Sequence, residues 1–216
     1  MTVTRKYPAF FVFFFSIAFL LSCNNGDAKK SKPIADTTRK TIKKEIALLP
    51  EKKFESPPII NIVDTLAPKR TVIYCSDSAA NFDRIALKLG NIYGGKLTEY
   101  IKKNNLKVTG ATMAWYKKEH APWFFDAGIP VNKKGAKTVA NVHVRELAAG
   151  KVILAHFYGP YELLPQGYTA IKDFIKDNKK VAAGSPYEIY VTDPVDKNGK
   201  AVNPYKVQTD IVFPIK

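Results

Sequence analysis

Two side chains on one face of a predicted strand could bind a charged ligand. Residues 185–194 alternate apolar and polar side chains, as a half-buried strand does. Tyr187 and Ile189 share the face that suits a packed core, and Glu188 and Tyr190 share the other. A carboxylate beside an aromatic ring is ordinary on a solvated surface. Inside a concave aromatic site, however, it selects cationic or hydrogen-bonding ligands.

This strand has a counterpart earlier in the chain. Residues 110–116 align with residues 184–190, and both segments begin with Gly and end with Tyr. Residues 126–131 align in the same way with residues 210–215. An internal repeat of this kind indicates that the fold is built from two similar units.

Each unit is predicted to be strand, helix, strand, strand. In the first copy these elements cover residues 71–75, 78–105, 111–116 and 123–130, and Gly94-Gly95 can interrupt the helix. In the second copy they cover residues 152–158, 161–180, 185–191 and 204–213. The sequence therefore predicts an α+β fold, a tandem βαββ repeat. Its antiparallel sheet should carry two helices on one face and a ligand cleft on the other.

Alternation along the strands assigns side chains to the uncovered face. It places Tyr116, Phe124, Tyr158 and Tyr190 there, around Glu188. Aromatic rings that are exposed together usually mark a contact surface. The first copy has an alanine where the second has Glu188, so this pair of strands contributes one carboxylate. The alternative is that Glu188 is an edge carboxylate paired with one of the many lysines.

The repeat and two segments of the second copy resemble a known family. These segments are Tyr158-Gly159-Pro160-Tyr161-Glu162 and the stretch from Glu188 to Pro194. With the βαββ duplication, they resemble the gyrase-inhibitor-like small-molecule-binding domains, which also form the effector-binding domains of multidrug-sensing bacterial transcription activators. The resemblance covers residues 71–216. It implies an aromatic cleft that binds amphipathic, often cationic, small molecules, with the pocket glutamate of the family at Glu188.

Residues 1–22 are typical of an export signal. Arg5 and Lys6 precede an apolar run at residues 9–21 that is too short to span a membrane comfortably. The run ends in Leu20-Leu21-Ser22-Cys23, which resembles the lipobox of bacterial lipoproteins. The resemblance implies cleavage before Cys23, attachment of acyl chains such as palmitate to that residue, and a position in the cell envelope, on the inner or outer membrane and facing the periplasm. A plain signal anchor with an incidental cysteine is the alternative.

The remaining chain divides at a change in composition. Residues 23–69 are rich in Lys, Thr and Pro and are predicted to be a flexible basic tether, and residues 70–216 are predicted to be the folded domain. The net charge is +15, but residues 71–216 contain no dense basic run, so we expect no nucleic-acid partner. No helix-turn-helix precedes the domain, which argues against transcriptional control.

The sequence favours binding over catalysis without excluding catalysis. It contains no G-x-S-x-G nucleophile motif, and its three histidines lack the spacing of metal ligands, so we expect no metal, no cofactor and no assigned catalytic residue. One alternative is a small-molecule hydrolase of the same fold with Glu188 as general base. Another is a protein-interaction module in the envelope. A closed pocket that holds Glu188 would favour a small ligand, and a flat sheet face would favour a protein partner.

Overall fold

A computed structural model of the protein describes residues 56–118 and 120–216. Residues Lys53–Lys216 form one compact unit. The predicted signal segment, Cys23 and the tether as far as residue 55 lie outside the described residues. None of the described helices is both long enough and apolar enough to cross a membrane.

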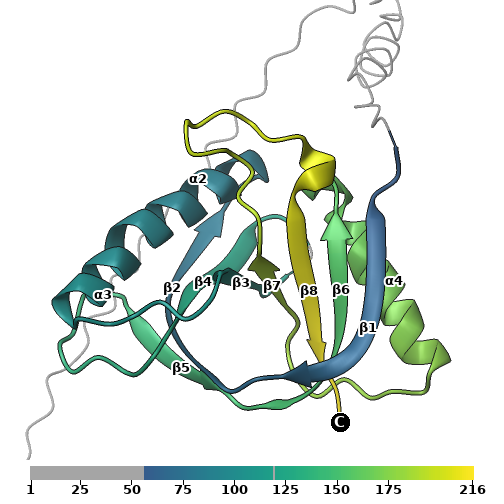
Figure 1. Ribbon diagram of the computed structural model, residues 1–216, viewed down its shortest axis with the longest axis horizontal. Coiled ribbons are helices and arrows are strands. Elements are labelled where there is room, and N and C mark those ends of the chain that lie inside the picture. The colour runs from purple at the N-terminus through teal and green to yellow at the C-terminus, as the bar shows by residue number, and fades with distance from the viewer. Residues whose placement is uncertain (1–55, 119) are drawn as a thin grey trace, which may run out of the picture. The chain divides into compact units, whose positions relative to one another are not determined.

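Eight strands of the described region form a single antiparallel sheet in the order β1-β6-β8-β7-β3-β4-β2-β5 (Figure 1). The strands are β1 Ile59–Ala67, β2 Arg70–Ala79, β3 Thr112–Tyr116, β4 Trp123–Val131, β5 His143–Leu147, β6 Gly150–Tyr158, β7 Tyr187–Tyr190 and β8 Gln208–Pro214. This arrangement confirms the predicted α+β class and its antiparallel sheet.

Two helical segments cover one face of this sheet. The first runs without a break through α2 (Asp83–Asn91), a π-helical turn η2 (Ile92–Leu97) and α3 (Thr98–Lys103). The π-helical turn contains Gly94-Gly95, where the sequence suggested an interruption. The second segment is a short 3-10 turn η3 (Tyr161–Leu163) followed by α4 (Leu164–Asp177), and a further 3-10 turn η4 (Pro204–Lys206) precedes β8.

The strand order shows the predicted duplication directly. The two copies meet at the centre, where β3 pairs with β7 and Ala114 lies opposite Glu188. On either side of this pair follow β4 and β8, then β2 and β6, then the edge strands β5 and β1. Each half of the sheet carries its own helical segment (Figure 1). The centre of the sheet therefore lies between the two helical segments.

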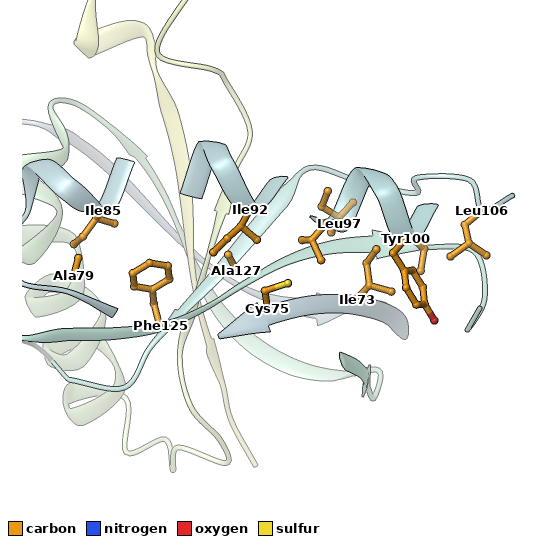
Figure 2. Packing of buried hydrophobic residues seen from close by; sticks show 12 residues of the cluster. Ile73, Cys75, Ala79, Ile85, Ile92, Leu97, Tyr100, Leu106, Phe125 and Ala127 are labelled. Carbon is orange, nitrogen blue, oxygen red and sulfur yellow. The ribbon is translucent and has the colours of Figure 1, made fainter. Parts of the chain in front are cut away.

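Hydrophobic side chains fill the space between each helical segment and the sheet. Ile85, Ile92 and Leu97 of the first segment belong to one buried cluster with Cys75 and Phe125 of the strands beneath (Figure 2). A second cluster lies under α4, and a third lies on the opposite face of the sheet. Burial of each such side chain contributes about 1.5–3 kcal/mol, so the unit has its own core.

Two predicted boundaries are wrong. Residues 59–67, which were assigned to the tether, form β1 and pair along their whole length with β6, so the folded domain begins before residue 70. The prolines at 57, 58 and 68 exclude a helix here, but they flank the strand, where proline is tolerated. In addition, β2 extends to Ala79 and the first helix begins at Asp83, five residues later than predicted.

Candidate functional site

A pocket of about 450 Å³ lies over the centre of the sheet, between the two helical segments. Seven aromatic side chains line it: Phe82, Tyr93, Tyr116, Trp123, Tyr161, Tyr168 and Tyr190. Glu188 lies among them on β7, and Asp193 with two lysines, Lys118 and Lys172, completes the charged part of the lining. Among the described residues that line the pocket there is no Ser, Cys or His.

Glu188 is a buried carboxylate held by two tyrosines. It is only 4% exposed. Tyr168 of α4 donates a hydrogen bond to its Oε1 at 2.9 Å, and Tyr190 of the same strand donates to its Oε2 at 2.8 Å. None of the ion pairs within the described residues involves Glu188. The carboxylate is therefore hydrogen-bonded but forms no ion pair with a cation in the described part of the chain.

The hydrogen bonds continue from Glu188 into the other half of the pocket. The hydroxyl groups of Tyr116 and Tyr190 lie 2.9 Å apart. Since Tyr190 gives its one proton to Glu188, Tyr116 is the donor to Tyr190. Tyr116 and Tyr190 occupy equivalent positions in the two copies of the repeat, so a chain of phenols crosses the junction of the copies and ends on the carboxylate.

Burial controls the protonation of this group. It raises the pKa of Glu188 to about 7, although the hydrogen bonds from Tyr190 and Tyr168 act in the opposite direction. Burial and the nearby Glu188 together raise the pKa of Tyr190 well above its usual value and that of Tyr161 to about 12. The phenols therefore stay protonated as hydrogen-bond donors, while Glu188 can change its charge near neutral pH.

Local sequence explains how the helices bring their tyrosines to the pocket. Tyr161 and Tyr168 are seven residues apart, about two helical turns, and so lie on the same side of η3 and α4. Gly167 lets α4 approach the sheet, because a Cβ at this position would lie 2.6 Å from Ile211 Cδ1. On the other side, Tyr93 of the π-helical turn donates a hydrogen bond to the carbonyl oxygen of Met113 on β3 at 2.8 Å.

The structure brings together three of the five predicted ligand-binding residues. Glu188, Tyr190 and Tyr116 all line the pocket. Phe124 and Tyr158 do not line it; they point to the opposite face of the sheet. There Phe124 is 40% exposed and lies under the ammonium group of Lys118, and Tyr158 donates a hydrogen bond to Gln208.

The face of the cleft also differs from the prediction, because the pocket is on the face that the helices cover. Alternation does not distinguish the two faces of β3 and β7, since central strands are buried on both. Met113, Ala114 and Trp115 are buried in succession, as are Tyr187 and Glu188. The register resolves the question, because Glu188 lies opposite Ile211, a core residue beneath α4. A shift of one residue in register exchanges the two faces of a strand.

The prediction missed the pocket residues that the helices supply. Tyr93 and Tyr168 lie in the segments that were predicted to be helices, and both pack against the core, but they also line the pocket. The sequence did contain a signal for them, because Tyr161 and Tyr168 lie on one side of a predicted helix and both carry a hydroxyl group that can reach a pocket. Trp123, at the start of β4, lies on the helix-covered face and also lines the pocket.

The opposite face of the sheet carries polar groups that bind one another. Asp126 accepts hydrogen bonds from Ser76 and Arg145, each at 2.6 Å, and forms an ion pair with Lys117. Asp210 accepts a hydrogen bond from Gln208 and lies 2.7 Å from Nδ1 of His156. No group of three or more metal-ligating side chains occurs within residues 56–118 and 120–216.

Solved structures show the same fold. EcmrR in complex with DNA, determined by cryo-EM, is 20% identical with a TM-score of 0.61, covering 82% of this chain and 62% of that chain. The C-terminal domain of EcmrR is 21% identical with a TM-score of 0.59, covering 73% and 98%. SAV2435 bound to tetraphenylphosphonium is a more distant likeness, 15% identical with a TM-score of 0.47, covering 72% of this chain and 94% of that chain.

The family is shown by a more direct match. No curated protein matches the chain. The family model for the GyrI-like small molecule binding domain, however, matches residues 95–216, which is more than half of the sequence. The matched region includes the pocket residues of β3, η3, α4 and β7. The chain belongs to the GyrI-like family of small-molecule-binding domains.

Proposed function

We propose that this chain is an envelope lipoprotein whose domain binds amphipathic cations in the pocket that contains Glu188. The observation that carries the proposal is a buried carboxylate, surrounded by aromatic rings, that has no cationic partner among the described residues. Isolated buried charges are costly, so such a group gains from a ligand that brings the opposite charge.

The dimensions and lining of the pocket fit a ligand of this kind. Its volume of about 450 Å³ lies within the range of small-molecule sites. The aromatic rings provide apolar area and negatively polarised faces for the body of the ligand. Together, the rings and the Glu188 carboxylate would favour a cation by roughly 1–3 kcal/mol over a neutral molecule of the same shape.

The same geometry weighs against the two alternatives. A partner protein would need a broad surface, whereas Glu188 lines a pocket and is only 4% exposed. A hydrolase would need an activated nucleophile or a positioned water. The described lining contains no Ser, Cys or His, and the hydroxyl of Thr169, one of its two threonines, donates to the carbonyl oxygen of Pro165. Glu188 is hydrogen-bonded on both oxygens by tyrosines, an arrangement that suits a recognition group better than a general base.

The proposal is tested by titrating the domain 53–216 with tetraphenylphosphonium, which carries one positive charge on an apolar body. Calorimetry should show binding by the wild type and at least about tenfold weaker binding by Glu188→Gln, which removes the charge but keeps the shape. Glu99→Gln is the matched control, because Glu99 is exposed on α3 and does not line the pocket. Triphenylphosphine oxide, which is uncharged, should bind both variants alike.

Two results would contradict this function. One is an unchanged affinity of Glu188→Gln for the cation. The other is an equal preference of the wild type for the cation and the uncharged compound, which would mean that the pocket selects apolar shape alone.

The anchor and the location rest on the sequence of residues 1–23. With acyl chains on Cys23, the protein would be held on the inner or outer membrane of a bacterium and face the periplasm. Cys23→Ser should release the protein from the membrane fraction after a carbonate wash. Retention of the variant in that fraction would refute the lipid anchor without affecting the proposal on the pocket.

A further inference from the structure

We propose that one end of the domain is a docking surface for anionic lipid headgroups. This end, here called the basic end, consists of residues 102–111, which are the last two residues of α3 and the loop that follows, and residues 132–142 after β4. The two segments contain six lysines and no Asp or Glu. The lysines are all exposed: Lys102, Lys103, Lys107, Lys133, Lys134 and Lys137.

Backbone and asparagine hydrogen bonds hold the two segments together. Asn104 donates from Nδ2 to the carbonyl oxygen of Lys137 at 2.9 Å and accepts from the backbone N–H of Lys137 at 2.7 Å. Asn132 accepts at Oδ1 from the backbone N–H of Lys107 at 2.9 Å, and its own N–H donates to the carbonyl oxygen of Lys107. Lysines some thirty residues apart in sequence are thus fixed on one surface.

Their charges are not neutralised within the described residues. No ion pair formed there involves any of the six lysines. Lys103 donates to the carbonyl oxygen of Thr138 at 3.0 Å, which orients its ammonium group but leaves its charge. The nearest acidic residue in the sequence before residues 102–111 is Glu99 on α3. Val108, which is 54% exposed, adds an apolar side chain to the basic end.

The equivalent end of the other copy is different, so the basic end is not a requirement of the fold. The last turns of α4 and the residues after it carry Lys176, Lys179 and Lys180, but these alternate with Asp173 and Asp177. Lys180 also forms an ion pair with Asp64 at 2.7 Å. The internal duplication thus offers a built-in comparison in which one end is balanced and the other is not.

The chemistry of the basic end favours a lipid surface over a nucleic acid. The two segments contain no Arg and no aromatic ring, the side chains that read base edges and stack on bases. Lysine ammonium groups are point charges that suit diffuse anionic headgroups, and an exposed apolar residue among them can contact the acyl boundary. A lipid anchor on the same chain would keep such a surface near a membrane, but the proposal depends neither on the anchor nor on the pocket ligand.

The experiment measures cosedimentation of the domain 53–216 with vesicles. One set contains phosphatidylcholine only, and the other contains one third phosphatidylglycerol. The test variant is Lys133→Glu, Lys134→Glu and Lys137→Glu combined. The control, Lys197→Glu, Lys200→Glu and Lys206→Glu combined, makes the same change of charge on exposed residues of the loop and turn before β8. Far-UV circular dichroism and a cooperative urea unfolding transition verify that each variant is folded.

We expect the wild type to bind the anionic vesicles at least about tenfold more tightly than the neutral ones, with the difference reduced by added salt. The test variant should lose at least about tenfold of this binding, and the control should stay within about twofold. Equal losses in both variants would overturn the proposal, since only net charge would then matter. Tighter binding to a short DNA duplex than to anionic vesicles, lost in the test variant, would also overturn it.

Discussion

Two carboxylates of this domain have the same low solvent exposure but lie in opposite electrostatic environments. Asp126 on one face of the sheet and Glu188 on the other are each 4% exposed. Burial by itself acts to raise the pKa of each group. For Asp126 the hydrogen bonds from Ser76, Arg145 and Lys117 outweigh burial and hold its pKa below the usual value. For Glu188 the two tyrosines do not outweigh burial, and its pKa rises to about 7.

The difference shows which buried charge belongs to the fold and which is left for a ligand. One partner of Asp126 is itself held in place, because the guanidinium of Arg145 contacts the rings of Tyr74 and Trp115, 4.2 and 4.5 Å from their centroids. Its charge is neutralised inside the protein. Glu188 has hydrogen-bond donors but no counter-charge among the described residues. The ion pair of Asp126 thus stabilises the fold on one face of the sheet. On the other face, Glu188 has no opposite charge beside it among the described residues.

The largest expected effect comes from removing the charge of Asp126. Asp126→Asn should lower the free energy of unfolding by about 3 kcal/mol, because it leaves Arg145 without its counter-charge. Glu188→Gln, the same chemical change on the other face, should cost nothing at pH 8 or should stabilise the domain. Urea denaturation of both variants at pH 8 measures the contrast. Equal destabilisation by both would mean that Glu188 also supports the fold.

The next effect is a pH dependence of opposite sign for the two acids. The pKa of Glu188 is higher in the folded domain than its usual value of 4.5, so its bound proton stabilises the fold. This contribution is complete below about pH 4.5 and is lost as the pH rises through about 7. The lowered pKa of Asp126 acts in reverse, since its contribution is present above its unfolded pKa and is lost as the pH falls through its folded pKa.

Between pH 5 and pH 8 the wild type should therefore lose about 2 kcal/mol of stability relative to Glu188→Gln. Urea denaturation of both proteins at the two pH values measures this difference, and other titrating groups cancel in the comparison. Parallel stability profiles for the two proteins would show that the pKa of Glu188 is not raised in the folded domain.

The sequence predicted the duplication and the antiparallel sheet because their signals are local. Gly and Tyr recur at matching positions in the two copies, and each predicted strand has its own pattern. The edge strand β1 was missed because its apolar residues lie among prolines and lysines, and its partner β6 is ninety residues away. Pairing over such a distance leaves no trace in a single sequence.

Glu188 was predicted to lie at the centre of the site, and the structure places it in the pocket lining but on the face opposite to the predicted one. Its side was inferred from the polarity of its neighbours, and polarity does not mark the faces of a strand that is buried on both. Phe124 and Tyr158 were grouped with it for the same reason. The basic end was also not predicted from the sequence, since its lysines belong to two short segments that only the fold brings together.

The smallest expected effect tests the hydrogen bonds that distinguish Glu188 from Asp126. Tyr168→Phe removes the donor to Oε1 of Glu188, which should raise the pKa of this carboxyl further above 7 and leave it more protonated at neutral pH. The affinity for tetraphenylphosphonium at pH 7 should then fall by roughly threefold to tenfold, which corresponds to the net contribution of one typical hydrogen bond. At pH 9, where the carboxyl is ionised in both proteins, the loss should be smaller.

Tyr161→Phe is the matched control for this variant. Tyr161 lines the same pocket and comes from the same helical segment, but it does not donate a hydrogen bond to Glu188. Removal of the Tyr161 hydroxyl group should leave the pH dependence of binding unchanged. If Tyr168→Phe and Tyr161→Phe weaken binding equally at both pH values, the tyrosines act only as apolar walls. The protonation of Glu188 would then be set by burial alone, and the contrast with Asp126 would reduce to the presence or absence of Arg145 and Lys117.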